Sequence, residues 1–279
     1  MDRHIDEIEF TIFDTETTGL DPRGGDRIVE IAALRFKGNR KIATFQTLVD
    51  PQRDISAAAF AVNKISALML KGAPSIERVI PGFFDFVKDS CLCSYNAGFD
   101  LEFLYNELGI GGKPLAPFKE AAKQLFVVDV LKMARRLMPG LERYALWFVS
   151  ETLGLRTQQS HRALSDVELT WEVFTRLKEK YTAKGLTGFK NFVGLFGLNP
   201  ELLENISQQK VAQIQEALGS GAKLKIRYLS TSSAALTERE VIPKEIKAVR
   251  SHLYLVGHCC LRNEERSFRV DNILHIELV

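Results

Sequence analysis

The spacing of apolar residues over the first fifty positions is typical of β-strands joined by short turns. Three runs rich in apolar residues are separated by polar stretches at 21–26 and at Gly38-Asn39, where turns are favoured. We therefore predict three strands, over residues 10–14, 27–36 and 41–49.

Helical periodicity begins in the next part of the chain. Apolar residues recur at intervals of three and four over 75–88, which predicts a helix there. A short apolar strand over 91–95 and a helix over 96–108 follow. The same patterns predict further elements, a strand at 126–128 and helices over 130–137, 143–153 and 163–181. A strand meander followed by alternating helices and strands indicates an α/β layered fold.

The pattern changes after residue 182. Residues 183–200 hold four of the 19 glycines and end in Asn199-Pro200, a favourable start for a helix that we predict over 200–218. Five runs of β character follow, over 223–229, 241–249, 252–260, 265–270 and 273–278. They predict a small all-β barrel or sandwich. We expect three segments: a first domain over 1–182, a linker with the start of the connecting helix over 183–208, and a second domain over 209–279.

Composition excludes disordered and fibrous classes, because 46% of the 279 residues are hydrophobic and 26% are charged. The net charge of +2 means that any nucleic-acid site must be a local patch. The amino terminus is too polar for a signal peptide and no apolar run approaches about 18 residues, so we expect a cytoplasmic protein without a membrane partner. The four cysteines lack metal or redox spacing and are predicted to be small core residues: Cys91, Cys93, Cys259 and Cys260.

Two acids close the first predicted strand, in FTIFDTETTGL at residues 10–20. Asp14 and Glu16 are two positions apart, and side chains two apart on a strand point to the same side. Their carboxylates therefore leave the strand in one direction.

Two further acids head the apolar stripes of predicted helices. Asp100 shares a stripe with Leu104 and Leu108, and Asp166 heads the stripe that continues at 169, 173 and 177. An unpaired carboxylate on a packing face is costly, although the first turn of a helix favours negative charge. Four carboxylates that met at one place would require cations between them.

Hard divalent ions with oxygen ligands fit this requirement. A pair of such ions is a known device for phosphodiester hydrolysis, which also needs a base for the attacking water. His161 is available, and histidine has an ordinary pKa of about 6.5. Since five residues turn a helix by about 140°, we expect His161 to reach Asp166 from the loop before the helix. Taken singly, each of these residues also fits a turn, a helix start or an exposed surface.

Three motifs in order, DTETTG, NAGFD and HRALSD, resemble those of the DEDDh (DnaQ-like) 3′→5′ exonucleases, over about residues 8–181. The resemblance implies a ribonuclease H-like fold, with a five-stranded mixed sheet flanked by helices. It also implies that Asp14, Glu16, Asp100 and Asp166 hold two Mg²⁺ or Mn²⁺ ions and that His161 is the general base.

The same resemblance indicates candidate substrate contacts at Thr15, Thr17, Thr18, Gly19, Leu20 and Asn96. It further implies that Asn96 supports the loop that delivers Asp100 and that Asp129 has a structural role. The chain departs from the family at Tyr95, where many members have histidine, and at 63–65, where Asn-Lys-Ile replaces a common His-Gly-Ile. These departures bear on substrate contacts and leave the metal ligands intact.

Residues 209–279 resemble a WYL domain, a small β domain of bacterial proteins associated with nucleic-acid or ligand binding. The naming tripeptide is Leu253-Tyr254-Leu255 here, and Asn272 replaces a common arginine. A basic, aromatic-lined pocket for a nucleotide or oligonucleotide is a candidate, formed by Arg239, Tyr254, Arg266, Phe268 and Arg269. Solvated barrel charges and core aromatics are the alternative, and strand alternation puts Arg269 on the face opposite Arg266.

Together these features predict a metal-dependent 3′→5′ exonuclease acting on DNA or RNA 3′ ends, whose second domain binds nucleic acid or a regulatory ligand. The alternative is a nucleic-acid-binding or ligand-sensing regulator with a vestigial exonuclease domain. The presence of all four acids argues against that alternative. A polymerase or repair protein is a candidate partner.

Overall fold

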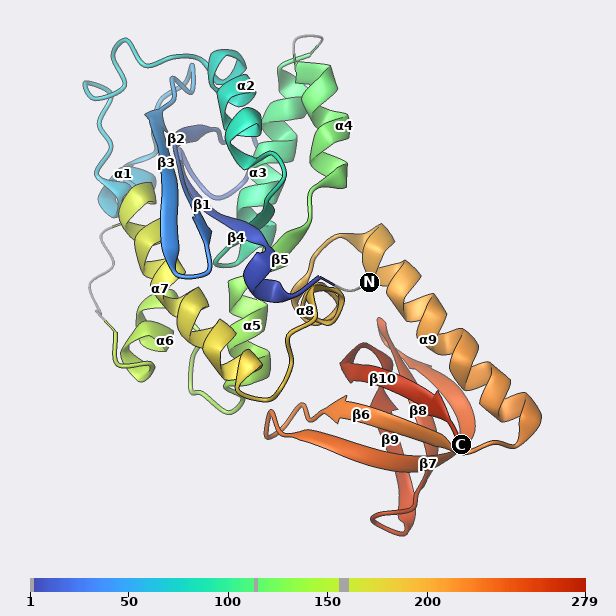
Figure 1. The fold of residues 1–279 in the computed structure, drawn as a ribbon. Helices are drawn as coiled ribbons and strands as arrows, with labels where there is room; N and C mark the ends of the chain where they lie inside the picture. Colours follow the sequence, from blue (N-terminus) through green and yellow to red (C-terminus); the bar gives the residue numbers. More distant parts are fainter. Residues whose placement is uncertain (1–2, 113–114, 156–160) are drawn as a thin grey trace.

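Two five-stranded β-sheets organise the molecule, as Figure 1 shows. The structure is a computed structural model that describes residues 3–112, 115–155 and 161–279. The first sheet belongs to the amino-terminal part of the chain and the second to its last 60 or so residues, and a long helix, α9 (Pro200–Ser220), leads from one to the other.

The first sheet is mixed, as predicted. Its order is β3-β2-β1-β4-β5, with β1 in the centre. The strands are β1 (Glu9–Thr17), β2 (Ile28–Lys37), β3 (Arg40–Leu48), β4 (Cys91–Ser94) and β5 (Val127–Asp129). The first three pair antiparallel as a meander, and β4 and β5 run parallel to β1. β1 extends three residues beyond the predicted end, so both of its acids lie within the strand.

Helices cover both faces of this sheet, which is why β1 is apolar on both sides. Phe10 and Ile12 pack in a core with α5 (Val130–Leu137), α6 (Leu146–Thr152) and α7 (Ala163–Thr182). Phe13 packs on the other face with α2 (Ile76–Val87), α3 (Ala97–Ile110) and α4 (Ala116–Gln124). A short helix, α1 (Ala57–Asn63), lies beside the turn that follows β1.

The second sheet is antiparallel throughout, with the order β10-β6-β7-β8-β9. Its strands are β6 (Leu224–Leu229), β7 (Leu236–Val249), β8 (His252–Cys259), β9 (Glu264–Arg269) and β10 (Ile273–Leu278). Helix α9 supplies Ile214 and Ala217 to the small core of this sheet. All five predicted strands are present, and β7 begins five residues earlier than predicted.

The segment predicted as a linker, 183–208, contains a helix that packs on the first sheet. This helix is α8 (Phe189–Phe196), and its Phe192, Leu195 and Phe196 are fully buried. The Phe192 ring contacts those of Phe10 and Phe174, with centroids 5.9 and 6.1 Å away. Residues 189–196 therefore belong to the core of the first sheet. The division into 1–182, 183–208 and 209–279 stays a prediction.

Three of the four cysteines are buried, as expected of core residues, but Cys260 is exposed at the end of β8. That part of the prediction is wrong because Cys260 lies one residue beyond the strand, in the turn before β9. Within the described ranges, every helix is too short or too polar to cross a bilayer.

Candidate functional site

Three of the predicted acids form a compact cluster at the end of β1. One carboxylate oxygen each from Asp14, Glu16 and Asp166 lies within 4.8 Å of the others. β1 brings the first two to the same side of the sheet, and α7 supplies Asp166 from its first turn. Oxygen atoms this close can contact one small divalent cation together.

The fourth acid, Asp100, lies next to the cluster but its carboxylate is turned towards neighbouring donors. Its Oδ1 accepts hydrogen bonds from the Thr15 amide at 3.0 Å and the Thr15 hydroxyl at 2.7 Å. Its Oδ2 accepts one from the Ser94 hydroxyl at 2.6 Å. Thr15 and Ser94 therefore set the orientation of Asp100, whose charge acts on Asp14.

Burial and mutual repulsion make this group of acids hard to ionise. Burial, followed by the charge of Asp100, raises the pKa of Asp14 well above its ordinary range. Burial, followed by the charges of Asp166 and Glu30, raises the pKa of Glu16 to about 8. Burial also raises the pKa of Asp100 to about 6, although its hydrogen bonds act in the opposite direction. A divalent cation would favour the ionised carboxylates, so the donor set and its electrostatics fit a metal.

A fifth acid, Glu30 on β2, was not predicted from the sequence. It pairs with Glu16 across the strands and only 1% of its surface is exposed. Arg162 donates to it from Nε at 3.1 Å and Nη2 at 2.9 Å, and the Ala163 amide donates at 3.2 Å. Burial acts to raise the pKa of Glu30, but these bonds, with one from Gln46, lower it overall. Glu30 therefore anchors the start of α7 as a carboxylate.

His161 lies in the loop before α7, as its spacing from Asp166 predicted. It is exposed and has a left-handed backbone, with φ of 50°. The residue that follows it is Arg162, which is held by Glu30. The chain is therefore fixed on the helix side of His161, which is exposed five residues before Asp166.

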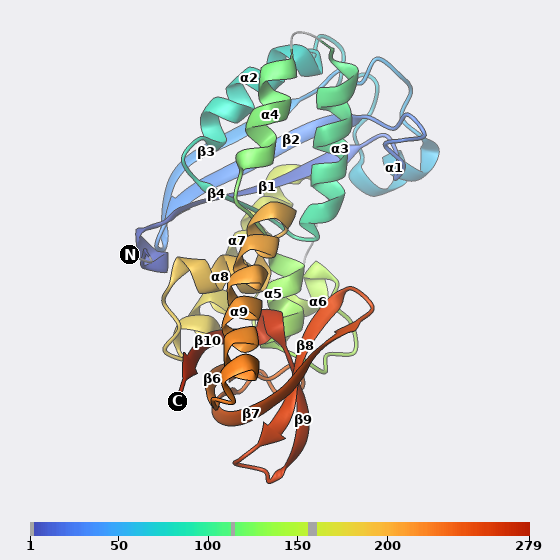
Figure 2. The same ribbon diagram turned by 90° about the vertical axis from the view of Figure 1, so that its right-hand side faces the viewer.

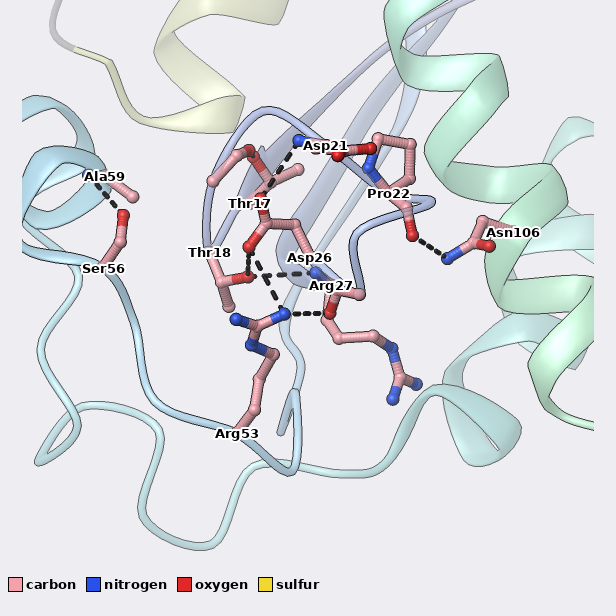
Figure 3. Close-up of polar contacts among 12 residues, drawn as sticks. Thr17, Thr18, Asp21, Pro22, Asp26, Arg27, Arg53, Ser56, Ala59 and Asn106 are labelled. Carbon is pink, nitrogen blue, oxygen red and sulfur yellow. Dashed lines mark hydrogen bonds and ion pairs between the residues drawn. The ribbon is translucent and has the colours of Figure 1, made fainter.

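The turn after β1 is closed by its own side chains (Figure 3). Thr18 donates to Asp26 Oδ1 at 2.9 Å, and the Asp21 amide donates to Asp26 Oδ2 at 3.0 Å. The Thr17 hydroxyl donates to the carbonyl of Gly19 at 2.5 Å. A Cβ atom at Gly19 would lie 2.1 Å from the Asp26 carboxylate. Thr17 and Thr18, both predicted substrate contacts, thus form hydrogen bonds within the turn. Gly19, a third predicted contact, leaves room for the Asp26 carboxylate.

Two predicted contact residues present their side chains outward. Leu20, in the turn after β1, is 83% exposed, and Asn96 is exposed before α3. The Asn96 amide donates to Asp129 Oδ1 at 3.1 Å, which also accepts from the Leu131 amide and caps α5. These bonds match the structural role predicted for Asp129. Tyr95, a departure from the family, donates to the Tyr144 carbonyl at 2.7 Å.

The structure separates the five residues predicted to form a pocket in the second domain. Phe268 is a core residue packed on Tyr228, and Arg266 is exposed beside Glu264. Arg269, on the opposite face of β9, pairs in register with Tyr254 and contacts Asp271. Arg239 lines a different cavity, with Lys225 and Cys260. Strand alternation places Arg266 and Phe268 on one side of β9 and Arg269 on the other, so the five side chains do not line one pocket in this arrangement.

Asn272 explains one departure from the WYL pattern. It is buried, donates to the Leu229 carbonyl at 2.8 Å and accepts a hydrogen bond from Arg136 of α5. Asp271 also accepts from Arg136, at 3.1 Å. Asn272, at the position where WYL domains commonly have arginine, therefore takes part in the contact between the two domains.

The comparisons with known proteins agree with these observations. The Exonuclease family (RNase_T) matches residues 11–174, and the WYL domain matches residues 209–278. The nuclease domain of 3′hExo, a DEDDh family member bound to rAMP, covers 64% of this chain and 94% of that chain, with a TM-score of 0.54. Its 17% sequence identity makes this a likeness of fold, and it confirms the ribonuclease H-like prediction.

Two relatives are bacterial DNA polymerase III proteins. A subunit epsilon-like protein from Rhodobacter capsulatus is 40% identical over 190 residues, which are 66% of this chain and 26% of that protein. The subunit epsilon of Treponema pallidum is 37% identical over 174 residues, 62% of this chain and 77% of that protein. The chain spans 26% or less of the length of the first four relatives. By these matches, the chain belongs to the Exonuclease family and carries a WYL domain after its exonuclease domain.

Proposed function

We propose that this protein is a metal-dependent 3′→5′ exonuclease that hydrolyses phosphodiester bonds at the 3′ ends of DNA or RNA. The observation that carries the proposal is the cluster of Asp14, Glu16 and Asp166, with one oxygen of each within 4.8 Å of the others. Asp100 lies beside it, so all four acids of the motif set gather at one end of β1. The family match and the relatives named as polymerase III epsilon subunits support the same activity.

Asp14, Glu16 and Asp166 would hold the metal, and Asp100 would complete the set for two Mg²⁺ or Mn²⁺ ions. Such ions polarise the phosphodiester and lower the pKa of an attacking water. The raised pKa values of Asp14 and Glu16 support this assignment, because the acids repel one another without a cation. Thr15 is a positioning residue, since both of its donors hold Asp100.

His161 is the proposed general base, accepting the proton of the attacking water from its exposed position before α7. Its place depends on the Arg162–Glu30 ion pair, in which Nη2 and Oε1 are 2.9 Å apart. The apolar side chain of Leu20 offers a contact for the terminal base, and the Asn96 amide group offers hydrogen bonds. Substrate binding thus relies on the outward residues, while the threonines keep the turn rigid.

The second domain is proposed to bind nucleic acid or a regulatory ligand, as WYL domains are associated with doing. A polymerase partner is proposed as well, because the matched relatives are named as DNA polymerase III proteins. Ligand binding by the second domain, association with a polymerase and the choice between DNA and RNA can each be measured directly.

Degradation of 5′-labelled single-stranded DNA and RNA of matched sequence tests the activity, with Mg²⁺, Mn²⁺ or EDTA. We expect metal-dependent, stepwise shortening from the 3′ end, which is abolished in Asp14→Asn. The matched control is Asp85→Asn, which changes an exposed aspartate on α2 and should retain full activity. If neither nucleic acid is cleaved with any divalent ion, the chain is better described as a regulator with a vestigial exonuclease domain.

A further inference from the structure

A cavity of about 560 Å³ lies where the second domain meets the exonuclease domain. Its walls come from Lys132 on α5, Gly194 on α8, Lys210 on α9, and Leu253 and Arg269 of the second domain. Figure 2 shows α9 running from the first domain past α8 to the second sheet. The volume falls in the range of about 300 to 1,000 Å³ that is usual for small-molecule sites.

Cations outnumber acids around this cavity. Asp271 is the inner carboxylate, and two guanidinium groups already hold it: Arg269 at 2.6 and 2.8 Å and Arg136 at 3.1 Å. Burial acts to raise the pKa of Asp271, but these arginines lower it to about 2, so it stays ionised. The other lining acid, Glu204, is exposed at the cavity wall and accepts a hydrogen bond from Gln208 at 3.1 Å.

Two lysines at the cavity have only main-chain partners among the contacts of the described residues. Lys132 donates to the Gly197 carbonyl at 2.9 Å, and Lys210 is 3.4 Å from the Val270 carbonyl. Burial lowers the pKa of each lysine to about 8; the charge of Asp271 acts in the opposite direction, and that of Arg136 in the same one. A partly buried ammonium without a carboxylate contact gains from any anion that reaches it.

The remaining walls combine apolar side chains with polar ones from Ser207, Gln208 and Ser251. Leu203, Ile206, Val211 and Leu253 line the cavity, together with the imidazole of His252. A cavity with cations at one place and apolar walls around them suits a molecule that carries both a phosphate and a flat organic group.

We propose that this interdomain cavity binds a small phosphate-bearing ligand of the nucleotide class, with Lys132 and Lys210 contacting the phosphate. The proposal refines the ligand role suggested for the second domain and assigns half of the site to α5 and α9. The cavity shares no residue with the carboxylate cluster, so it can bind whether or not the protein cleaves nucleic acid.

Binding of AMP, dAMP and inorganic phosphate to the full chain tests the proposal, by isothermal titration calorimetry. Asp14→Asn protein in EDTA is used so that metal-mediated binding at the carboxylate cluster is removed. We expect saturable binding of a nucleotide, weakened at least tenfold by Lys132→Gln or Lys210→Gln. The matched control, Lys247→Gln, changes an exposed lysine of β7 outside the cavity and should bind as the parent does.

Three results would overturn the assignment. They are the absence of saturable binding of both nucleotides, unchanged affinity in both cavity variants, and inorganic phosphate binding as tightly as the nucleotides. Because each glutamine removes a partly buried charge, we expect both variants to stay folded, and a urea unfolding curve for each verifies this. The nuclease assay is separate, so failure of the activity and failure of this site are distinguishable.

Discussion

Glu16 gives the metal-free protein a pH-dependent stability that can be measured directly. Its pKa is raised from 4.5 to about 8 by burial and then by the charges of Asp166 and Glu30. A raised pKa means that the folded protein holds this proton more tightly than the unfolded chain does. Glu16 therefore has no effect on stability well below pH 4.5 and becomes increasingly destabilising as the pH rises towards 8.

The size of the effect follows from those two pKa values. Between pH 5.5 and pH 7.5, Glu16 alone should lower the free energy of unfolding by about 2.5 kcal/mol. Water that enters the metal-free site would reduce this figure, so it is an upper limit. Asp14 has a raised pKa for similar reasons and acts in the same direction.

Urea unfolding in EDTA at pH 5.5, 6.5 and 7.5 measures this loss. We expect wild-type stability to fall across the series, Glu16→Gln to fall distinctly less, and saturating Mg²⁺ to flatten the wild-type response. Asp85→Asn, a change of an exposed acid, should follow the wild type. The reasoning is refuted if wild-type stability is constant from pH 5.5 to 7.5, or if Glu16→Gln loses as much as the wild type.

Four other changes probe the scaffold. Arg27→Met leaves the buried Glu107 carboxylate, 2.6 Å from Arg27 Nη2, without its ion-pair partner and should lower the free energy of unfolding by about 3–5 kcal/mol in urea. Arg27→Lys keeps a positive charge there and should lower it less. Lys64→Gly removes a side chain from a left-handed backbone, φ 58°, and should raise the unfolding free energy by about 0.5–1 kcal/mol; a decrease would contradict this. Gly19→Ala places a methyl group 2.1 Å from an Asp26 carboxylate oxygen, so the turn after β1 must shift. We expect a higher KM for oligonucleotides in steady-state assays and only a small loss of stability in urea unfolding. Truncation to 1–182 removes the buried Phe192, so this fragment should be at least about 3 kcal/mol less stable than 1–199; equal urea midpoints would argue otherwise.

The positions of the acids followed from periodicity. Asp100 and Asp166 head apolar stripes, and both are indeed buried, at 2% and 4% exposure. The pairing of Asp14 with Glu16 required only strand alternation, because the two residues share one element. Local spacing was sufficient to single out these four acids.

Features that depend on distant contacts were not predicted. Glu30 and Arg162 are 132 residues apart in the chain, and the only local signal was a lone acid in the apolar strand IVEIAAL. The orientation of Asp100 depends on Thr15 and Ser94, which no spacing rule connects to it.

Three helices were also missed, each because its local pattern is weak. α1 is seven residues long and leaves Phe60 and Val62 about half exposed, so it shows no apolar stripe. α4 has few apolar residues, and Ala122 is its buried one. α8 lies in a glycine-bearing stretch whose composition indicated a linker, yet its aromatic residues pack into the core. Tertiary burial decided its structure more than local composition did.

Helix α5 makes the two domains of this protein poor candidates for exchange with those of other proteins. Its cap, Asp129, holds the Asn96 amide four residues before Asp100, while Arg136 in its last turn contacts Asp271 and Asn272. The eight residues of α5 thus connect the segment that leads into Asp100 with the contact between the two domains. A chimera with a different second domain would leave Arg136, with only 12% of its side chain exposed, without its partners. Fusing the exonuclease domain to a different second domain would therefore require a substitution of Arg136 on α5.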